Sequence, residues 1–193
     1  MTEHETPLQP STLAEQTGPL YAVLRELEAH ASETGWDQPE RLFAIAETAD
    51  LVRREPQLAA LLGLEGGADA PAYTPIEQDQ MSPGQSLEDV LAQITWPPEV
   101  VGVAAVAERL VLPPGVEDIP EDPAQAAAYA AAHPDRQEVR IVAAALRNGE
   151  SACALRLRSH DSDELVLTGE DLVPGLLTQL HATLDLEETA ADE

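Results

Sequence analysis

The sequence predicts a single α+β domain in which a mostly antiparallel sheet carries helices on its apolar face. Two strand-like runs, residues 138–147 and 150–158, flank Asn148-Gly149, a pair typical of β-hairpin turns because both turn residues must tolerate positive φ. Predicted helices precede the main strands and one follows them, an order typical of α+β proteins. Aromatic residues make up only 3% of the chain, so Leu, Val and Ala must build the core through close backbone approach.

A two-residue loop sets the expected register of this hairpin, with Arg147 facing Glu150 and Ala144 facing Cys153. The hairpin is expected to form the middle of the fold. Because side chains alternate along a strand, one face then collects the apolar residues Val142, Ala144, Leu146, Cys153, Leu155 and Leu157.

The arginines of the hairpin are the second feature of this register. Arg156 and Arg158 are expected on the opposite face, in water. Arg140 falls on the apolar side, a misfit that a bulge or a frayed strand end would resolve. These arginines either neutralise nearby acids or form the one locally positive face of the protein.

The chain is expected to begin with a flexible arm, residues 1–16, followed by one domain over residues 17–186 and an acidic tail, residues 187–193. Thr12 and Glu15 have the spacing of a capping box within the arm. A helix opens at Thr17-Gly18-Pro19 and ends at Gly35, with apolar residues at helical spacing at Leu20, Val23, Leu24, Leu27 and Ala31.

The next segments alternate between short elements and connectors. Residues 41–47 are interpreted as a strand rather than the start of a longer helix, because they lie between a proline turn and Thr48. Residues 50–54 and 56–62 are expected to be helical, with Pro56 restarting the helix. Residues 64–85 are rich in Gly, Pro and acid, and are expected to form a mobile surface loop.

The second half of the chain holds the main strands. A short helix starts after Ser86, a β-branched strand covers residues 100–112, and an alanine-rich helix covers residues 124–132. After the hairpin, residues 164–167 are expected to form a third consecutive strand. A last helix is expected to begin near Thr168, with Pro174 in its first turn.

Charge excludes some classes of partner. The chain has a formal net charge of −26, ten arginines and no lysine, so its surface repels nucleic acid and anionic lipid. The N-terminal residues lack the basic start and apolar run of a signal peptide, and no run of ~20 apolar residues is present. We therefore expect a cytoplasmic protein that binds neither nucleic acid nor membrane.

Candidate chemistry is sparse. Nucleophile-elbow, P-loop, dinucleotide-binding and H-E-x-x-H motifs are missing from the sequence, so no catalytic residue, metal ligand or cofactor is assigned. The single cysteine, Cys153, excludes an internal disulfide and is interpreted as an inert core thiol. His160–Glu164 is the alternative: such a turn could serve a small hydrolase or metal-dependent enzyme, although an ordinary polar turn is favoured.

The candidate partner-binding residues are Trp36, Asp37, Arg41, Arg156 and Arg158. In one interpretation, which is favoured, Trp36, Asp37 and Arg41 form a structural clasp with Arg41 paired to Asp37. In the other, they present an aromatic anchor and an arginine to a partner, residue types enriched at binding hot spots. Either way, the leading hypothesis is a non-enzymatic protein-binding or chaperone-like module with an unknown protein partner, acting as a monomer or homodimer.

Four segments carry a family resemblance: GWDQPERLFAIAET, ITWPPEV, AERLVLPP and ALRLRSHDSDELVLTGEDLVPGLLTQL. They resemble an uncharacterised family of small acidic actinobacterial proteins, over most of the chain after Gly18 apart from residues 64–85. The resemblance implies a cytoplasmic setting but no activity, cofactor or catalytic residue. The layout is also similar to that of small secretion-chaperone-like domains, although a shared fold does not transfer function.

Overall fold

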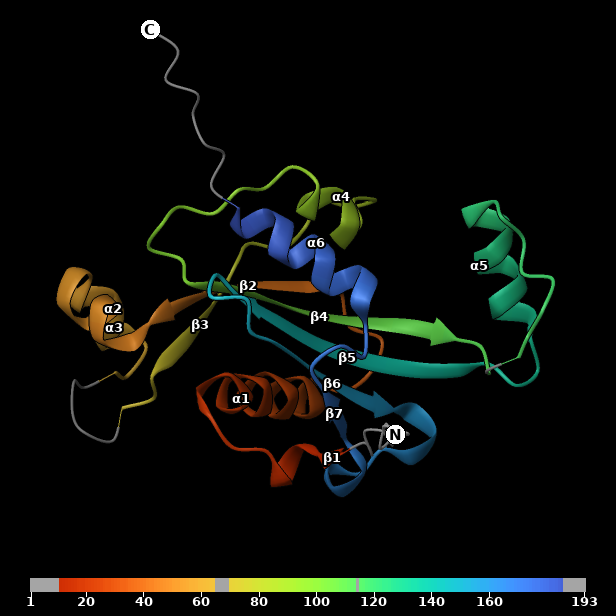
Figure 1. Cartoon of the computed structure of the whole chain (residues 1–193), viewed down its shortest axis with the longest axis horizontal. Coiled ribbons are helices and arrows are strands. Elements are labelled where there is room, and N and C mark those ends of the chain that lie inside the picture. The colour runs from red at the N-terminus through yellow and green to blue at the C-terminus, as the bar shows by residue number, and fades with distance from the viewer. Residues whose placement is uncertain (1–10, 65–69, 114, 186–193) are drawn as a thin grey trace, which may run out of the picture.

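A computed structural model describes residues 11–64, 70–113 and 115–185. Its centre is a seven-stranded sheet in the order β1-β7-β6-β5-β4-β2-β3, in which all neighbouring strands are antiparallel (Figure 1). The strands are β1 (Ser11–Thr12), β2 (Arg41–Glu47), β3 (Tyr73–Glu77), β4 (Gly102–Val111), β5 (Gln137–Leu146), β6 (Ser151–Leu157) and β7 (Leu167–Gly169).

The helices of the described ranges are α1 (Pro19–Thr34), α2 (Thr48–Arg54), α3 (Pro56–Leu61), α4 (Leu87–Leu91), α5 (Pro123–Ala132) and α6 (Pro174–Leu184). The α+β class, the single domain and the antiparallel sheet are therefore confirmed. None of the helices in these ranges has the length and apolar character needed to cross a membrane.

Helices cover both faces of the sheet, so the expectation of one covered face is wrong. In Figure 1, α1 lies below the sheet, and α4 and α6 lie above it. Each side has its own apolar core: Leu24, Phe43 and Val142 belong to the α1 side, and Leu91, Ala143 and Leu180 to the α4–α6 side. The central strands allow this because they are apolar at nearly every position, which suits strands buried on both faces.

The hairpin forms where predicted, but its register is shifted by one residue. Its loop has three residues, Arg147, Asn148 and Gly149, and the Leu146 N–H donates to the carbonyl oxygen of Glu150 across it. Gly149 has φ 93°, the left-handed residue that usually completes a three-residue loop. Ala144 therefore lies opposite Ala152 instead of Cys153.

This one-residue shift changes the face of every residue on β6, because side chains alternate along a strand. Cys153, Leu155 and Leu157 pack on the α4–α6 side, away from Val142 and Ala144. Arg156 moves to the α1 side of the sheet, where it is buried, so the prediction that it points into water is wrong.

Most of the other elements lie where the sequence places them. The strand at residues 41–47, the helices after Thr48 and Pro56, and the alanine-rich helix α5 are all confirmed. Helix α1 ends at Gly35, which has φ 88°. Pro174 occupies the first turn of α6, the only part of a helix where its missing N–H and fixed φ are tolerated.

Three segments differ from prediction. Strand β3 lies within the predicted loop 64–85, where it pairs with β2; residues 65–69 lie outside the described residues. The chain after η3 (Asp163–Leu165) forms β7, and the last helix begins at Pro174 rather than near Thr168. Strands β3 and β7 have too few residues for a clear periodic pattern.

The N-terminal arm and the acidic tail are described only in part. Ser11 and Thr12 pair with β7, and Leu13 is buried. Thr12 and Glu15 form the expected capping box. These residues belong to the fold because Leu13 fills the α1-side core, whereas residues 1–10 and 186–193 lie outside the described residues.

Strands β4 and β5 extend beyond the rest of the sheet and carry α5 at their far end, away from α1 and α6 (Figure 1). We call the described residues 108–113 and 115–138 the α5 arm. Its base is the cross-strand pair Glu108 and Arg140 on β4 and β5. Helices α2 and α3 lie at the opposite end of the molecule (Figure 1).

Candidate functional site

Trp36 lies between the end of α1 and the outer part of the hairpin. Gly35 and Asp37 on either side of it both have positive φ, 88° and 63°, and this backbone reverses the chain so that the indole meets β5 and β6. The guanidinium carbon of Arg140 lies 4.4 Å from the ring centroid and that of Arg158 lies 5.4 Å away. The indole Nε1 donates a hydrogen bond of 3.0 Å to Asp161.

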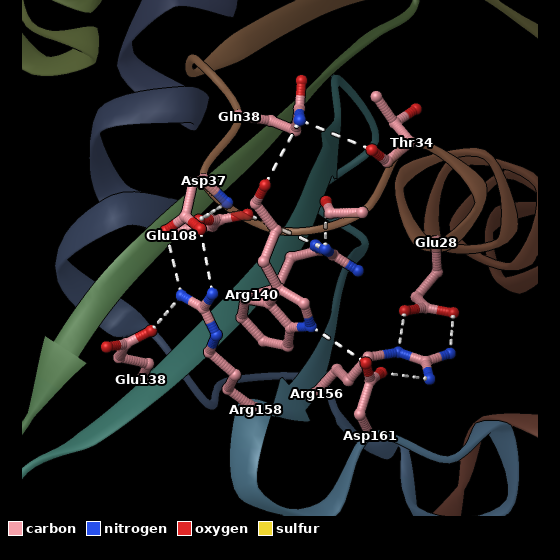
Figure 2. Close-up of polar contacts among 12 residues, drawn as sticks. Glu28, Thr34, Asp37, Gln38, Glu108, Glu138, Arg140, Arg156, Arg158 and Asp161 are labelled. Carbon is pink, nitrogen blue, oxygen red and sulfur yellow. Dashed lines mark hydrogen bonds and ion pairs between the residues drawn. The ribbon is translucent and has the colours of Figure 1, made fainter.

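The corrected hairpin register explains why acids gather here. Arg140 and Arg156 are directly opposite each other on β5 and β6, and each is only 2% exposed. Like charges facing each other across a sheet are destabilising, and buried charges require partners. We call Trp36, Arg140, Arg156, Arg158 and the acids that contact them the Trp36 cluster; Figure 2 shows its polar contacts.

Arg156 is the centre of the Trp36 cluster. Its Nε and Nη2 donate to the two carboxylate oxygens of Glu28 on α1, at 2.6 and 2.8 Å (Figure 2). Its Nη1 donates to Asp161 at 3.0 Å, and its Nη2 also donates to Asp163. These hydrogen bonds, that of Glu28 first, raise the pKa of Arg156 above its ordinary value. All three guanidinium nitrogens are therefore engaged inside the protein.

Arg158 closes the exposed side of the cluster. Its two terminal nitrogens donate to the two oxygens of Asp37 at 2.9 Å each, and one also donates to Glu138 (Figure 2). The hydrogen bond from Arg158 lowers the pKa of Asp37 below its ordinary value. The backbone N–H of Asp37 donates to Glu108 at 2.8 Å, which ties the turn to the base of the α5 arm.

Arg140 is held mainly by the aromatic ring and the end of α1. Its Nη2 donates to the carbonyl oxygen of Gly35, and the same nitrogen is 3.7 Å from Glu108. The predicted misfit of Arg140 on the apolar side is thus resolved by cation–π contact and an acid, without a bulge or a frayed end.

Arg41 lies outside the Trp36 cluster, so its predicted pairing with Asp37 is wrong. It donates two hydrogen bonds, of 2.7 and 2.8 Å, to Glu77 on β3, and this pairing lowers the pKa of Glu77. Its guanidinium carbon is 5.3 Å from the ring centroid of Phe43. The reason is register: Glu77 lies opposite Phe43 across β2 and β3, within diagonal reach of Arg41.

The structure therefore brings together Trp36, Asp37, Arg156 and Arg158 and leaves Arg41 apart. Their contacts are those of a structural clasp between α1, the hairpin and the chain after it. Binding of a partner by these residues remains a prediction, because the contacts that they make are all within the chain.

The His160–Glu164 turn belongs to the same cluster. Asp161 accepts from Trp36 and Arg156, and Asp163 accepts from Arg156; the bond from Trp36, followed by that from Arg156, lowers the pKa of Asp161. The Nδ1 of His160 lies 2.9 Å from the hydroxyl of Ser159. Among the described residues, no group of three His, Cys, Asp or Glu side chains is arranged to hold a metal ion.

Cys153 lies in the α4–α6-side core and is fully buried. Burial raises the pKa of its thiol to about 11. At neutral pH the sulfur is therefore protonated and a poor nucleophile, in agreement with its interpretation as a core thiol.

The α5 arm contrasts with the Trp36 cluster: the cluster buries charged residues, whereas the arm exposes uncharged and apolar ones. Helix α5 has the sequence PAQAAAYAAA, which contains no charged residue, and none of its residues is buried. Its N-terminus is capped by Asp122, which accepts from the N–H of Gln125 at 2.9 Å. Three large apolar side chains of the arm are also exposed, Leu110 by 40%, Val111 by 37% and Ile119 by 49%.

Comparison with known proteins assigns a family. A family model described as PPA1309-like protein matches residues 20–185. The chain belongs to the PPA1309-like family. Searches of curated proteins and of solved structures gave no match.

In this PPA1309-like protein, the matched range contains both the Trp36 cluster and the α5 arm. The sequence predicted α5 as a helix but not its position away from both cores. A signal was present: its only large apolar residue is Tyr129, so α5 lacks the apolar stripe that would dock a helix on a core.

Proposed function

We propose that this chain is a non-enzymatic protein-binding module whose docking surface is the α5 arm. The observation that carries the proposal is that α5 is uncharged and has no buried residue, in a chain in which 24% of residues are charged. Exposed apolar surface, where it forms a patch, marks interaction sites in soluble proteins. Binding would cover the alanine surface, Val111 and Ile119. Leu110, next to Val111 on β4, points to the other face of the sheet.

The open edge of the sheet is a less suitable docking site. Gln78 donates to Leu42, and Ala72 accepts from Thr48, so the even-numbered residues of this segment bond to β2. Pro75, at the middle of β3, is therefore directed to the open edge, where it supplies no N–H donor. Proline on an edge strand opposes the addition of another strand.

The Trp36 cluster is also less suitable, because Arg156 and Arg158 already have partners. Arg156 is buried and engaged by three acids, and Arg158 is engaged by Asp37 and Glu138. An incoming carboxylate would have to displace these groups. The cytoplasmic and actinobacterial setting belongs to the same proposal and is supported by the family resemblance. The chaperone-like role rests only on the similar layout, and a monomeric or homodimeric state is part of the proposal without support from the family.

Affinity capture with three matched variants tests this proposal. Leu110→Ser with Val111→Ser and Ile119→Ser changes the arm, Leu61→Ser with Leu62→Ser changes exposed leucines at the opposite end, and Arg158→Gln changes the Trp36 cluster. We expect one bound protein to be lost with the arm variant alone. Loss with Arg158→Gln alone, when that variant is folded, would contradict the proposal and favour the Trp36 cluster.

A further inference from the structure

Acidic residues lie next to the uncharged helix of the α5 arm. The acidic residues of the arm are Glu108, Glu117, Asp118, Glu121, Asp122, Asp135 and Glu138. Of these, Glu117, Asp118, Glu121, Asp122 and Asp135 are exposed. They lie in the connector before α5 and in the turn after it, so they flank the uncharged helix at both of its ends.

The two arginines of the arm do not balance this charge. Arg109 donates to Glu40 and Glu88, which lie outside the arm. Arg136 donates to the neutral carbonyl oxygen of His133 and keeps its charge, so it offsets one of the five exposed acids. The local charge is therefore negative, in a chain whose formal net charge is −26.

This charge decides between the possible occupants of the surface. A second copy would bring the same acids against each other, and each copy carries the same net charge, so like-charge repulsion opposes self-association through the arm. An anionic partner is opposed for the same reason. A partner with apolar side chains flanked by lysine or arginine would instead meet complementary groups.

We propose that the α5 arm binds a cationic amphipathic helix of a partner protein. The apolar side chains of that helix pack on the alanines of α5 and on Val111 and Ile119, since small side chains permit close approach of two helices. Its lysines or arginines lie near Glu117, Asp118 and Glu121. This inference rests on the proposed function and adds the chemistry of the partner.

Three synthetic peptides of about 18 residues test whether the arm prefers a cationic partner. Each peptide has leucines at helical spacing. The remaining positions are Lys in the first, Gln in the second and Glu in the third, and binding is measured by fluorescence anisotropy of a labelled peptide at roughly 0.15 M salt. We expect the Lys peptide to bind at least about tenfold more tightly than the Gln peptide, and the Glu peptide most weakly.

Protein variants test the location. The triple variant Leu110→Ser, Val111→Ser and Ile119→Ser should weaken binding of the Lys peptide by about tenfold or more, while Leu61→Ser with Leu62→Ser should not change it. Glu117→Gln with Asp118→Asn and Glu121→Gln should weaken binding and reduce its salt dependence. Asn suits position 118 because Asp118 has φ 64°, which Asn tolerates well.

Two outcomes separate this inference from the proposed function. If the Gln peptide binds as tightly as the Lys peptide and the arm variant weakens both, the arm is a docking surface but the cationic partner is wrong. If the Lys peptide binds all variants equally, it binds the general acidic surface, and this inference is overturned. Failure of all three peptides also overturns it, whereas affinity capture tests the docking surface independently.

Discussion

The Trp36 cluster and the α5 arm adjoin each other on β4 and β5, yet both depart from the usual rule that charged residues are exposed and uncharged ones are buried. The cluster buries Arg140 and Arg156 to 2% exposure, whereas the arm exposes a helix without any charged residue. In the cluster, the buried charges are explained by partners within the chain. In the arm, α5 adds no residue to either core, and this exposure is the basis of the proposed docking surface.

The largest effect that separates the two regions is expected from Arg156→Gln. This substitution leaves Glu28, which is 5% exposed, without its bidentate cation, and removing one member of a buried ion pair costs ~3–5 kcal/mol. We expect a loss of about 3 kcal/mol in the free energy of unfolding, measured by urea denaturation.

Arg158→Gln is the matched control for this prediction. Arg158 is 40% exposed and Asp37 is 73% exposed, so solvent screens this pair and we expect a clearly smaller loss than for Arg156→Gln. Equal losses for the two variants would mean that burial does not set the importance of the arginines in the cluster.

A smaller effect is expected from Gly149→Val in the hairpin loop. A side chain at this position would meet no atom within 4 Å, but the residue has φ 93°, a conformation that a β-branched residue adopts only with strain. We expect a loss of ~1–2 kcal/mol, read from the denaturation midpoint.

Gly115 provides a comparison within the α5 arm. It has φ 90° and similar free space, but the neighbouring segment contributes to neither core. We expect Gly115→Val to cost less than about 0.5 kcal/mol, because a poorly packed loop relaxes around the substitution. A cost at Gly115 as large as that at Gly149 would show that the arm folds as one cooperative unit with the body.

How far the sequence could predict these regions depends on the range of the interactions. Local signals placed α1, β2 and α5, because helix caps, prolines and alanine content act within a few residues. Asn148-Gly149 identified the hairpin but not its loop length. That single residue of register moved Arg156 from water to the core side of the sheet.

The Trp36 cluster depends on contacts between distant residues. Glu28 and Arg156 are 128 positions apart, and no periodicity in the sequence links them. Trp36 and Arg158 could be identified as unusual residues, but their pairing follows only from the twist and register of the sheet. The exposure of α5 was equally hidden, since helix propensity does not specify whether a helix packs on a core.

A third prediction concerns pH. Hydrogen bonds from Trp36 and Arg156 lower the pKa of Asp161 in the folded protein, below the value of ~3.9 of an unperturbed aspartate. The stabilisation from Asp161 is therefore fully present above about pH 4 and is lost as the pH falls through the lower folded pKa.

Asp161→Asn removes this titration and tests its sign. Asp161 is 46% exposed, so we expect a loss of less than ~1 kcal/mol at neutral pH. The difference between wild type and variant should shrink as the pH falls through the folded pKa of Asp161, below which both side chains are uncharged. A difference that stays constant from neutral to acidic pH would indicate that the charge of Asp161 does not contribute.

The smallest effect on stability is expected from removal of the arm itself. Strands β4 and β5 still pair at Val111 and Gln137, so residues 113–135 can be replaced by Asn-Gly, which suits a two-residue hairpin turn. Because α5 buries no residue, no core contact is lost. Shortening this connection also lowers the entropic cost of closing the loop, by about 0.6 kcal/mol each time the loop length is halved.

We therefore expect the free energy of unfolding of this deletion variant to stay the same or rise by about 1 kcal/mol, while its far-ultraviolet circular dichroism loses helical signal. A loss of 2 kcal/mol or more, roughly the cost of a buried leucine, would mean that α5 does support the fold. The reason for proposing an external partner would then disappear, because a partner is required only if the chain itself gains nothing from the helix. An unchanged stability would leave binding as the remaining physical reason for an uncharged helix on so acidic a protein.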